Sequence, residues 1–216
     1  MDIGLYNEDG DVHIIEDIVI RDEETPVDVS SCPEAFGPVK AIFVNQGEHA
    51  YAKVRFDQDS IQWFIKNLNK VKDSTTRGAI WRYFWMSVME KSMKSTEFID
   101  FIVNQLPQEL EERILMTGLV QLRSLINDYL PVELVEEKKA ALFDAIYGVL
   151  LKGTATLEPM ADQLFGFIST EEQISKAIQW LKSGKIEDQG RLILELKPAH
   201  KHSILKKYFT LKDVPE

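Results

Sequence analysis

The chain has 216 residues, of which 44% are hydrophobic and 28% are charged, and its formal net charge is −10. This composition is typical of a globular protein that is large enough to bury a core without disulfides. The acidic net charge argues against nucleic acids and anionic membranes as partners, because both attract basic surfaces.

The single cysteine, Cys32, cannot form a disulfide within the chain and fits a reducing compartment. We interpret it as a loop or half-buried residue rather than as a nucleophile. The first residues lack the basic and apolar segments of a signal peptide, and no apolar run approaches the roughly 20 residues of a membrane span. The sequence therefore predicts a cytoplasmic protein.

Strand-like patterns dominate the chain before Asp57. β-Branched or alternating runs occur at residues 3–6, 12–20, 25–29, 39–44 and 50–56. The Asp-Gly pair in Asn7–Gly10 predicts a turn, and Pro26 restricts the third run to a sheet edge. Five strands are few for a free-standing sandwich. We therefore expect residues 1–57 to be part of a small antiparallel β-sandwich whose first half lies upstream.

The last strand-like run alternates between two faces. One face would carry Tyr51, Lys53 and Arg55, and the other would carry Ala52, Val54 and Phe56. Residues 45–49 would connect this run to the preceding one.

After Asp57 the apolar residues recur at helical spacing. Nine helices are predicted, at residues 59–70, 75–91, 95–106, 107–128, 131–152, 157–168, 170–184, 186–196 and 198–209. Gly153 is a predicted helix stop, and Thr170–Gln173 is a predicted capping box. Short links between such helices favour an α-solenoid of antiparallel hairpins, of the HEAT or armadillo kind. The predicted fold is thus α+β and predominantly α, with residues 58–216 forming a truncated helical domain.

A search for metal ligands finds no centre. The four histidines are His13, His49, His200 and His202, and no His-Glu-x-x-His motif occurs. On a helix, residues 200 and 202 would point about 200° apart, which does not suit one metal ion.

The carboxylate pairs Glu111–Glu112 and Glu136–Glu137 are adjacent on predicted helices, so they face different ways and indicate solvated surfaces. Gly47 and Gly153 are isolated, and no nucleophile elbow or phosphate-binding loop is present. We therefore predict no catalytic, cofactor-binding or metal-binding residue in this chain.

An aromatic cluster is the remaining candidate for a ligand pocket. It comprises Trp81, Tyr83, Phe84 and Trp85. At helical spacing such residues more often form a core. Arg77 and Arg82 flank the cluster, and Arg77 is a candidate structural arginine with backbone or carboxylate partners. A metal-independent enzyme built on this region would lack a base and a nucleophile.

Two segments resemble a known family. Residues 45–57, Asn-Gln-Gly-Glu-His-Ala-Tyr-Ala-Lys-Val-Arg-Phe-Asp, are similar to the segment that ends the β-sandwich of aminopeptidase N-type zinc peptidases, the gluzincins. Arg77, Trp81 and Trp85 resemble the Arg-x-x-x-Trp…Trp helix that follows in that family, and Phe98–Phe101 stands at its next helix.

The resemblance covers residues 3–130 by residue pattern and residues 131–216 by architecture alone. It has two departures: Met86 stands where many members have Asp, and Ala50 replaces a common Gly.

The resemblance implies that this chain is the non-catalytic C-terminal part of a zinc aminopeptidase, which removes N-terminal amino acids from peptides. Zinc would be bound by a catalytic domain upstream, and no cofactor would be bound here. The helical part would close the substrate cavity and limit which peptides enter, with the sandwich as a spacer. Its partners would be the other domains of the same polypeptide and, in the whole enzyme, peptide substrates.

The residues also allow a second interpretation from another class. The chain could be a stand-alone helical-repeat adaptor that binds proteins, with the strands as an N-terminal cap. In that case Met1 would be the natural start and a protein partner would be measurable.

Overall fold

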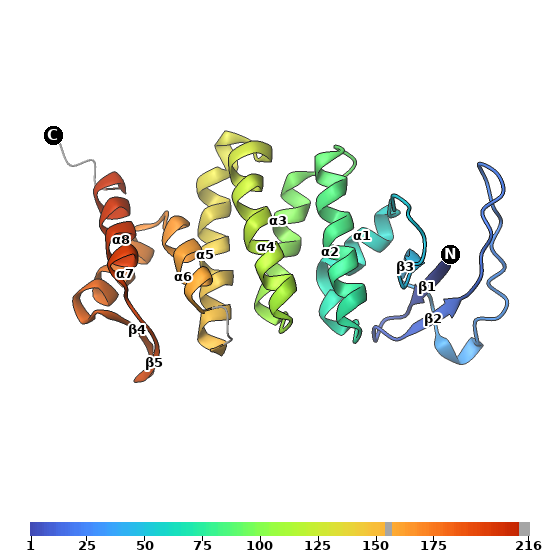
Figure 1. The fold of residues 1–216 in the computed structure, drawn as a ribbon, viewed down its shortest axis with the longest axis horizontal. Helices are drawn as coiled ribbons and strands as arrows, with labels where there is room; N and C mark the ends of the chain where they lie inside the picture. The colour runs from blue at the N-terminus through green and yellow to red at the C-terminus, as the bar shows by residue number, and fades with distance from the viewer. Residues whose placement is uncertain (154–156, 212–216) are drawn as a thin grey trace. The chain divides into compact units, whose positions relative to one another are not determined.

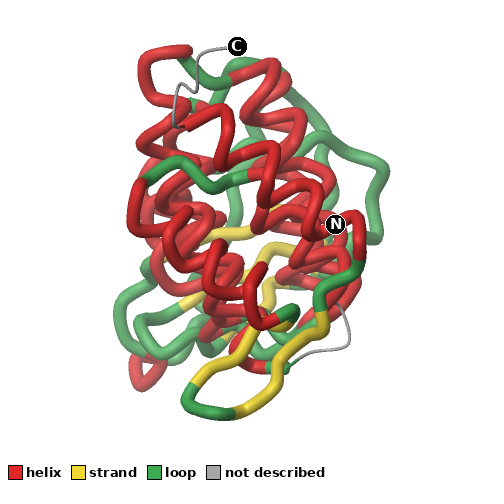
Figure 2. The backbone as a smooth tube through the Cα atoms, turned by 90° about the vertical axis from the view of Figure 1, so that its left-hand side faces the viewer, coloured by secondary structure: helices red, strands yellow, loops and turns green. Residues whose placement is uncertain are grey.

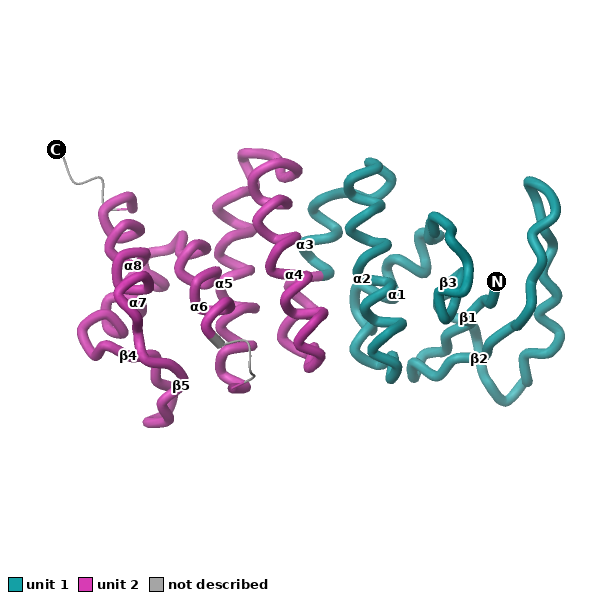
Figure 3. The backbone as a smooth tube through the Cα atoms, in the orientation of Figure 1, with its two compact units in different colours: residues 1–101 teal, residues 102–216 magenta. Residues whose placement is uncertain are grey.

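A computed structural model describes residues 1–153 and 157–211. In these ranges it contains eight α-helices and five short β-strands, so the predicted α+β, mainly helical class is confirmed (Figure 1). The chain divides into two compact units, residues 1–101 and 102–216 (Figure 3). The change from strand to helix near residue 57 therefore lies inside the first unit.

Within the same ranges, none of the helices is long and apolar enough to cross a bilayer.

The first unit begins with a three-stranded antiparallel sheet. Its strands are β1 (Asp2–Tyr6), β2 (Val12–Ile15) and β3 (Ala41–Gln46), in the order β2-β1-β3. The predicted turn after β1 is confirmed, because the Asn7 side chain accepts hydrogen bonds from the backbone N–H groups of Asp9 and Asp11, both at 3.0 Å. This side chain closes the β1–β2 hairpin together with two backbone hydrogen bonds, from the Asn7 N–H to the Asp11 carbonyl at 3.1 Å and from the Gly10 N–H to the Asn7 carbonyl at 3.2 Å.

The predicted strand over residues 12–20 is too long. β2 ends at Ile15, and Asp17 adopts a left-handed backbone with φ 58°. Beyond this break Ile18 exchanges two backbone hydrogen bonds with Met1, at 2.9 and 2.7 Å. A residue in the left-handed region interrupts the ladder in the manner of a β-bulge, which β-branched composition alone does not reveal.

The predicted strands at residues 25–29 and 50–56 are wrong, since neither segment is a strand. The two-sided alternation of the second is nevertheless confirmed. Val54 is buried, Ala52 and Phe56 are half-buried, and the alternate residues are exposed. Phe56 stacks on Phe43 of β3 with ring centroids 5.8 Å apart. Side-chain packing rather than strand pairing therefore holds this extended segment.

Two complete helices follow the sheet in the first unit. They are α1 (Gln58–Asn67), followed by a 3₁₀ turn at residues 68–70, and α2 (Ser74–Met89). Both agree with the predicted helices. The third predicted helix is also confirmed as α3 (Ser95–Gln105), which begins in this unit.

The predicted aromatic cluster belongs to the core of this unit. Trp81 and Phe84 are almost fully buried, and they meet Phe101 of α3 with centroid distances of 4.7 and 5.1 Å. Tyr83 is also buried, and Trp85 is half-buried against Phe98 at 5.6 Å. The interpretation as core is therefore confirmed for these rings.

The second unit contains five helices and a hairpin. The helices are α4 (Glu112–Ser124), α5 (Val135–Lys152), α6 (Leu157–Gly166), α7 (Glu171–Ser183) and α8 (Pro198–Leu211). α6 contacts both α5 and α8, and α8 also contacts α7. Phe165 of α6 and Trp180 of α7 lie in the centre of this packing, with ring centroids 6.5 Å apart.

The helix starts predicted at Pro107 and Pro131 are wrong by a few residues. Each proline instead belongs to or precedes a short 3₁₀ turn, and α4 and α5 begin at Glu112 and Val135. Before α4 the carboxylate of Glu109 accepts hydrogen bonds from the backbone N–H groups of Leu110 and Glu111, at 2.9 and 2.8 Å. This local bonding stabilises a turn in place of the first helical turn.

Two predicted helix ends are confirmed. Gly153 ends α5 in the left-handed conformation, with φ 72° and ψ 40°. The Thr170 hydroxyl accepts the N–H of Gln173 at 3.2 Å, which is one bond of the capping box, whereas the Gln173 side chain accepts the N–H of Ser169 at 3.1 Å instead of that of Thr170. α4 is followed by a π-helical turn at Leu125–Tyr129, which the sequence did not predict.

The helix predicted over residues 186–196 is wrong. This stretch forms β4 (Lys185–Asp188) and β5 (Arg191–Glu195), an antiparallel hairpin drawn as two yellow strands in Figure 2. Gln189 and Gly190 join the strands with φ 48° and 80°. Two consecutive left-handed residues are what a tight hairpin turn requires, and they cannot continue a helix.

Candidate functional site

Among residues 1–153 and 157–211, no group of three or more His, Cys, Asp or Glu side chains could hold a metal ion. His13 lies beside the Ser31 hydroxyl at 3.3 Å, and His49 lies 3.7 Å from a carboxylate oxygen of Asp2.

His200 and His202 face opposite environments, as predicted from their spacing. His200 is buried at the start of α8, whereas His202 is exposed. The Nδ1 atom of His200 accepts the Lys197 backbone N–H at 3.2 Å, and its Nε2 atom lies 3.2 Å from Oδ1 of Asp162. In the neutral ring, Nε2–H donates to Asp162, so both nitrogens are engaged and neither is available as a base.

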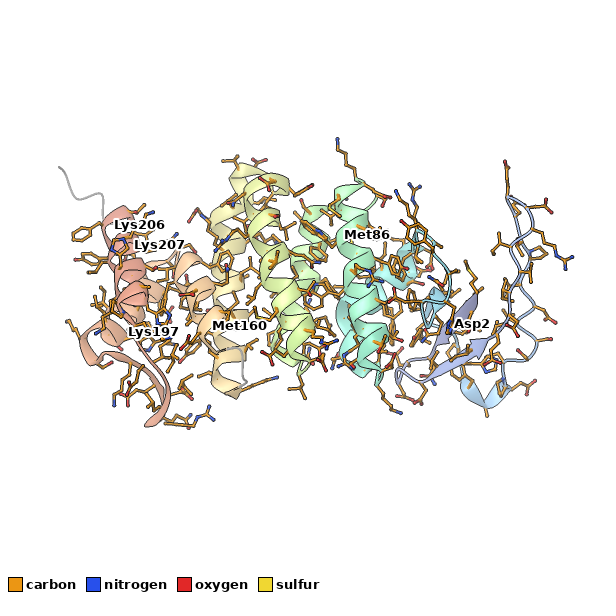
Figure 4. All side chains as sticks on the ribbon, viewed as in Figure 1. Asp2, Met86, Met160, Lys197, Lys206 and Lys207 are labelled. Atoms are coloured by element: carbon orange, nitrogen blue, oxygen red, sulfur yellow. The ribbon has the colours of Figure 1, made fainter. Side chains whose placement is uncertain are left out.

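Charges around His200 complete a structural cap for α8. Lys197, at the start of the helix (Figure 4), forms an ion pair of 2.5 Å with Glu158 of α6. The hydrogen bond from Lys197 and its positive charge hold the pKa of the Glu158 carboxyl below its usual range. The sequence did not reveal this role of His200, although Pro198 at the helix start and a polar side chain two residues later are its signature.

The other candidates also have structural surroundings. Cys32 is half-buried and free, as predicted. Lys139 pairs with Glu136 at 2.7 Å, and Lys138 pairs with Glu137 at 3.6 Å. These carboxylates are therefore neutralised on the surface and do not form an acid–base pair.

The segment that carries the family resemblance builds a strand-to-helix junction, which we define as residues 45–57 with Asp73–Tyr83. Asn45 is its centre: it is fully buried and left-handed, with φ 68°. Its Nδ2 atom donates to the Ala50 carbonyl at 2.8 Å, and its Oδ1 atom accepts the Ala50 N–H at 2.9 Å. The Asn45 side chain thus pairs with the backbone of Ala50 as a neighbouring strand would. This pairing closes the loop between Asn45 and Ala50.

Tyr83 and Arg82 of α2 attach this loop to the helix. The Asn45 amide also donates to the Tyr83 hydroxyl at 3.3 Å, and the Arg82 guanidinium donates to the Glu48 carboxylate. The loop is therefore held by a helix that lies about thirty residues further along the chain.

A buried chain of hydrogen bonds joins the sheet to the start of α2. The Tyr6 hydroxyl donates to Oε1 of Gln46 at 2.7 Å, and Nε2 of Gln46 donates to the Thr76 hydroxyl at 2.9 Å. Thr76 in turn donates to the Asp73 carboxylate at 2.6 Å. Burial raises the pKa of Tyr6 far above its ordinary value, so its hydroxyl stays protonated and acts as a donor.

Asp73 and Asp57 cap the two helices of the junction. The Asp73 carboxylate accepts the Thr76 N–H at 2.8 Å, and the Asp57 carboxylate accepts the Ser60 N–H at 2.9 Å. Burial raises the pKa of Asp73, but the hydrogen bonds from Thr76 outweigh it, so the pKa lies below its usual range. The same balance, with Ser60 as the donor, lowers the pKa of Asp57.

Arg77 has the structural role that the sequence suggested. Its guanidinium is half-buried and donates to the carbonyls of Val71 and Lys72, at 2.9 and 3.0 Å. These carbonyls end the link between α1 and α2, where no helical partner is available. The polar side chains of the junction thus bond backbone groups and one another, and they connect the sheet to the starts of α1 and α2.

Comparison of the chain with protein-family models and with curated proteins found no match.

Proposed function

We propose that this chain is the non-catalytic C-terminal part of a zinc aminopeptidase, in which the helices enclose the substrate cavity and limit peptide access. The observation that carries the proposal is the resemblance of residues 45–57 and Arg77–Trp85 to that family. The structure gives a physical reason for those residue types, since Asn45, Asp57 and Arg77 each bind backbone groups at the strand-to-helix junction.

In this proposal the finer architecture follows the family. The sheet β2-β1-β3 would be part of a β-sandwich that acts as a spacer, and the helices would continue as an α-solenoid of HEAT-like hairpins. A helical cover over a hydrolytic site excludes bulk water and completes the cavity, so it can select substrates without taking part in the chemistry. Zinc would be bound by a catalytic domain of the same cytoplasmic polypeptide.

The decisive experiment is to determine the coding sequence upstream of Met1 in the transcript. We expect an open reading frame that encodes a His-Glu-x-x-His motif. The full polypeptide should then hydrolyse aminoacyl anilides in a zinc-dependent reaction. A version that lacks residues 58–216 should change its preference for peptide length. An upstream frame without the zinc motif would refute the proposal.

The alternative, a protein-binding adaptor, is favoured by one specific observation. Large apolar side chains are exposed on two helices of the second unit, including Val120 on α4 and Phe209 on α8. Transcript sequencing separates the two functions, because the adaptor predicts that translation begins at Met1.

A further inference from the structure

One face of α4 combines exposed apolar residues with two arginines that form no salt bridge within the part of the chain that the structure describes. Arg113, Met116, Val120 and Arg123 follow at spacings of three, four and three residues, so they lie on one side of the helix. All four are exposed, and the side chain of Val120 retains 70% of its accessible surface. We call these four residues the α4 stripe.

The arginines of the stripe are notable because the chain is acidic, with a net charge of −10. In the ranges that the structure covers, no carboxylate forms a salt bridge with Arg113 or Arg123. Glu112 lies at the border of the stripe and is the nearest acid on the same helix. Along the helix axis the two arginines are about 15 Å apart, at 1.5 Å per residue.

A second segment of the same chain has the opposite character. Residues 16–24, Glu-Asp-Ile-Val-Ile-Arg-Asp-Glu-Glu, carry five acids and one base, a net charge of −4. We call this segment the acidic arm. Val19 and Ile20 in its middle are 62% and 55% exposed, and it contains neither helix nor strand.

The acidic arm and the α4 stripe match in order and in length. The arm has carboxylates on both sides of its apolar residues, and the stripe has arginines on both sides of Met116 and Val120. In an extended chain Asp17 and Asp22 are about 17 Å apart, at roughly 3.3 Å per residue, close to the spacing of the two arginines. Each surface exposes apolar side chains to water. The arm supplies carboxylates for the arginines of the stripe, and the stripe supplies arginines for the carboxylates of the arm.

We propose that the α4 stripe binds the acidic arm of a second copy of this chain. Each copy carries one stripe and one arm, so the contact is either made twice in a two-fold dimer or repeated head to tail along a chain of copies. The inference does not depend on the proposed aminopeptidase function, and its failure would leave that proposal untouched.

The test uses two charge-reversed variants of the full chain, studied by sedimentation velocity over a wide range of concentration. One carries Arg113→Glu and Arg123→Glu in the stripe, and the other carries Glu16→Lys and Asp22→Lys in the arm. Asp17 is left unchanged because of its left-handed backbone. All four substituted positions are exposed, so circular dichroism and thermal unfolding should match the unsubstituted chain.

The unsubstituted chain should self-associate as its concentration rises. The association should weaken between about 0.05 M and about 0.5 M NaCl, because salt screens the charges. Either variant alone should associate at least about tenfold more weakly, since like charges then meet at the contact. An equimolar mixture of the two variants should regain association, because each supplies the charge that the other has lost.

A matched control separates this contact from a general effect of charge. Lys66→Glu with Lys201→Glu changes the net charge by the same amount as the stripe variant, at two exposed lysines outside the stripe, and it should leave association unchanged. A chain that stays monomeric at all concentrations would overturn the proposal. So would association that persists undiminished in either variant, or a mixture that behaves like its separate components.

Discussion

Replacing Asn45 by Ala should destabilise the first unit strongly, because the buried Asn45 side chain bonds the Ala50 backbone in the way that a neighbouring strand would. The substitution removes the two hydrogen bonds to the Ala50 backbone, at 2.8 and 2.9 Å, and the contact with the Tyr83 hydroxyl at 3.3 Å. Alanine also lacks the short polar side chain whose local hydrogen bonds make the left-handed backbone at φ 68° acceptable for Asn45. The loop of residues 45–50 then loses the hydrogen bonds between its two ends. The extended segment of residues 50–56 loses the bonds that hold its first residue.

The magnitude follows from these two effects. Two lost hydrogen bonds cost about 2 kcal/mol, at roughly 1 kcal/mol each. The left-handed backbone adds about 1 kcal/mol for alanine, whereas glycine adopts it without steric cost. Asn45→Ala should therefore cost about 3 kcal/mol and Asn45→Gly about 2 kcal/mol. The difference between the two variants isolates the backbone conformation from the hydrogen bonds.

Urea unfolding followed by tryptophan fluorescence measures these values. Trp63, Trp81 and Trp85 lie in the first unit, so a Trp180→Phe background removes the one tryptophan of the second unit. With an m-value of about 2 kcal/mol/M, the midpoint should fall by about 1.5 M for alanine and about 1 M for glycine.

The control for this experiment is Lys66→Ala, an exposed substitution that should stay within about 0.5 kcal/mol. Equal losses for Ala and Gly would refute the role of the backbone conformation. A loss for Asn45→Ala no larger than that of the control would refute the whole reasoning.

Three further outcomes are expected. Asp73→Ala should destabilise the first unit by about 1–2 kcal/mol through loss of a helix cap. The folded-state pKa of Asp73 is lowered, so its contribution to stability is present above about pH 4 and is lost as the pH falls through the folded pKa. Urea midpoints of the variant and the unsubstituted chain, measured at several pH values, test this. A difference between the two midpoints that stays constant down to about pH 2 would contradict it. Gly10→Ala should lower the free energy of unfolding more than Gly190→Ala does. Both glycines have φ near 80°, but a β-carbon at Gly10 would lie 2.7 Å from the Lys70 carbonyl oxygen, whereas one at Gly190 would meet open space. Equal shifts of the urea midpoint would contradict this steric argument. The isolated chain should contain no stoichiometric zinc by metal analysis and should not hydrolyse aminoacyl anilides; one zinc per chain, or turnover by the pure protein, would contradict the reading of this chain as non-catalytic.

Features fixed by local chemistry were predictable from the sequence. Gly153 ends its helix as a left-handed cap, and the hydroxyl of Thr170 caps the next helix but one. Helical spacing identified the buried rings of α2, because a stripe of Trp and Phe has only the core as a stable environment. These outcomes depend on a few neighbouring residues, so a single sequence contains the information.

Features decided by tertiary contacts were not predictable in the same way. Residues 50–56 have a strand pattern, but their backbone finds no strand partner, and Asn45 and α2 hold them instead. Residues 186–196 have enough apolar residues to suggest a helix, yet Gln189 and Gly190 form a tight turn whose first member carries no glycine signal. The bonds made by His200 and Glu109 were missed because neither residue is one of the Ser, Thr, Asp and Asn side chains by which a helix start is usually recognised.

The junction also shows what kind of evidence can decide the function. Its polar side chains bond backbone groups and one another, and so they connect the sheet to the first helices. A spacer under a substrate-enclosing domain requires such a connection, because cavity walls must hold their positions while a peptide enters. An adaptor that presents a binding surface requires it equally. The two functions therefore differ in what is encoded beside the junction, and sequencing the transcript addresses that difference directly.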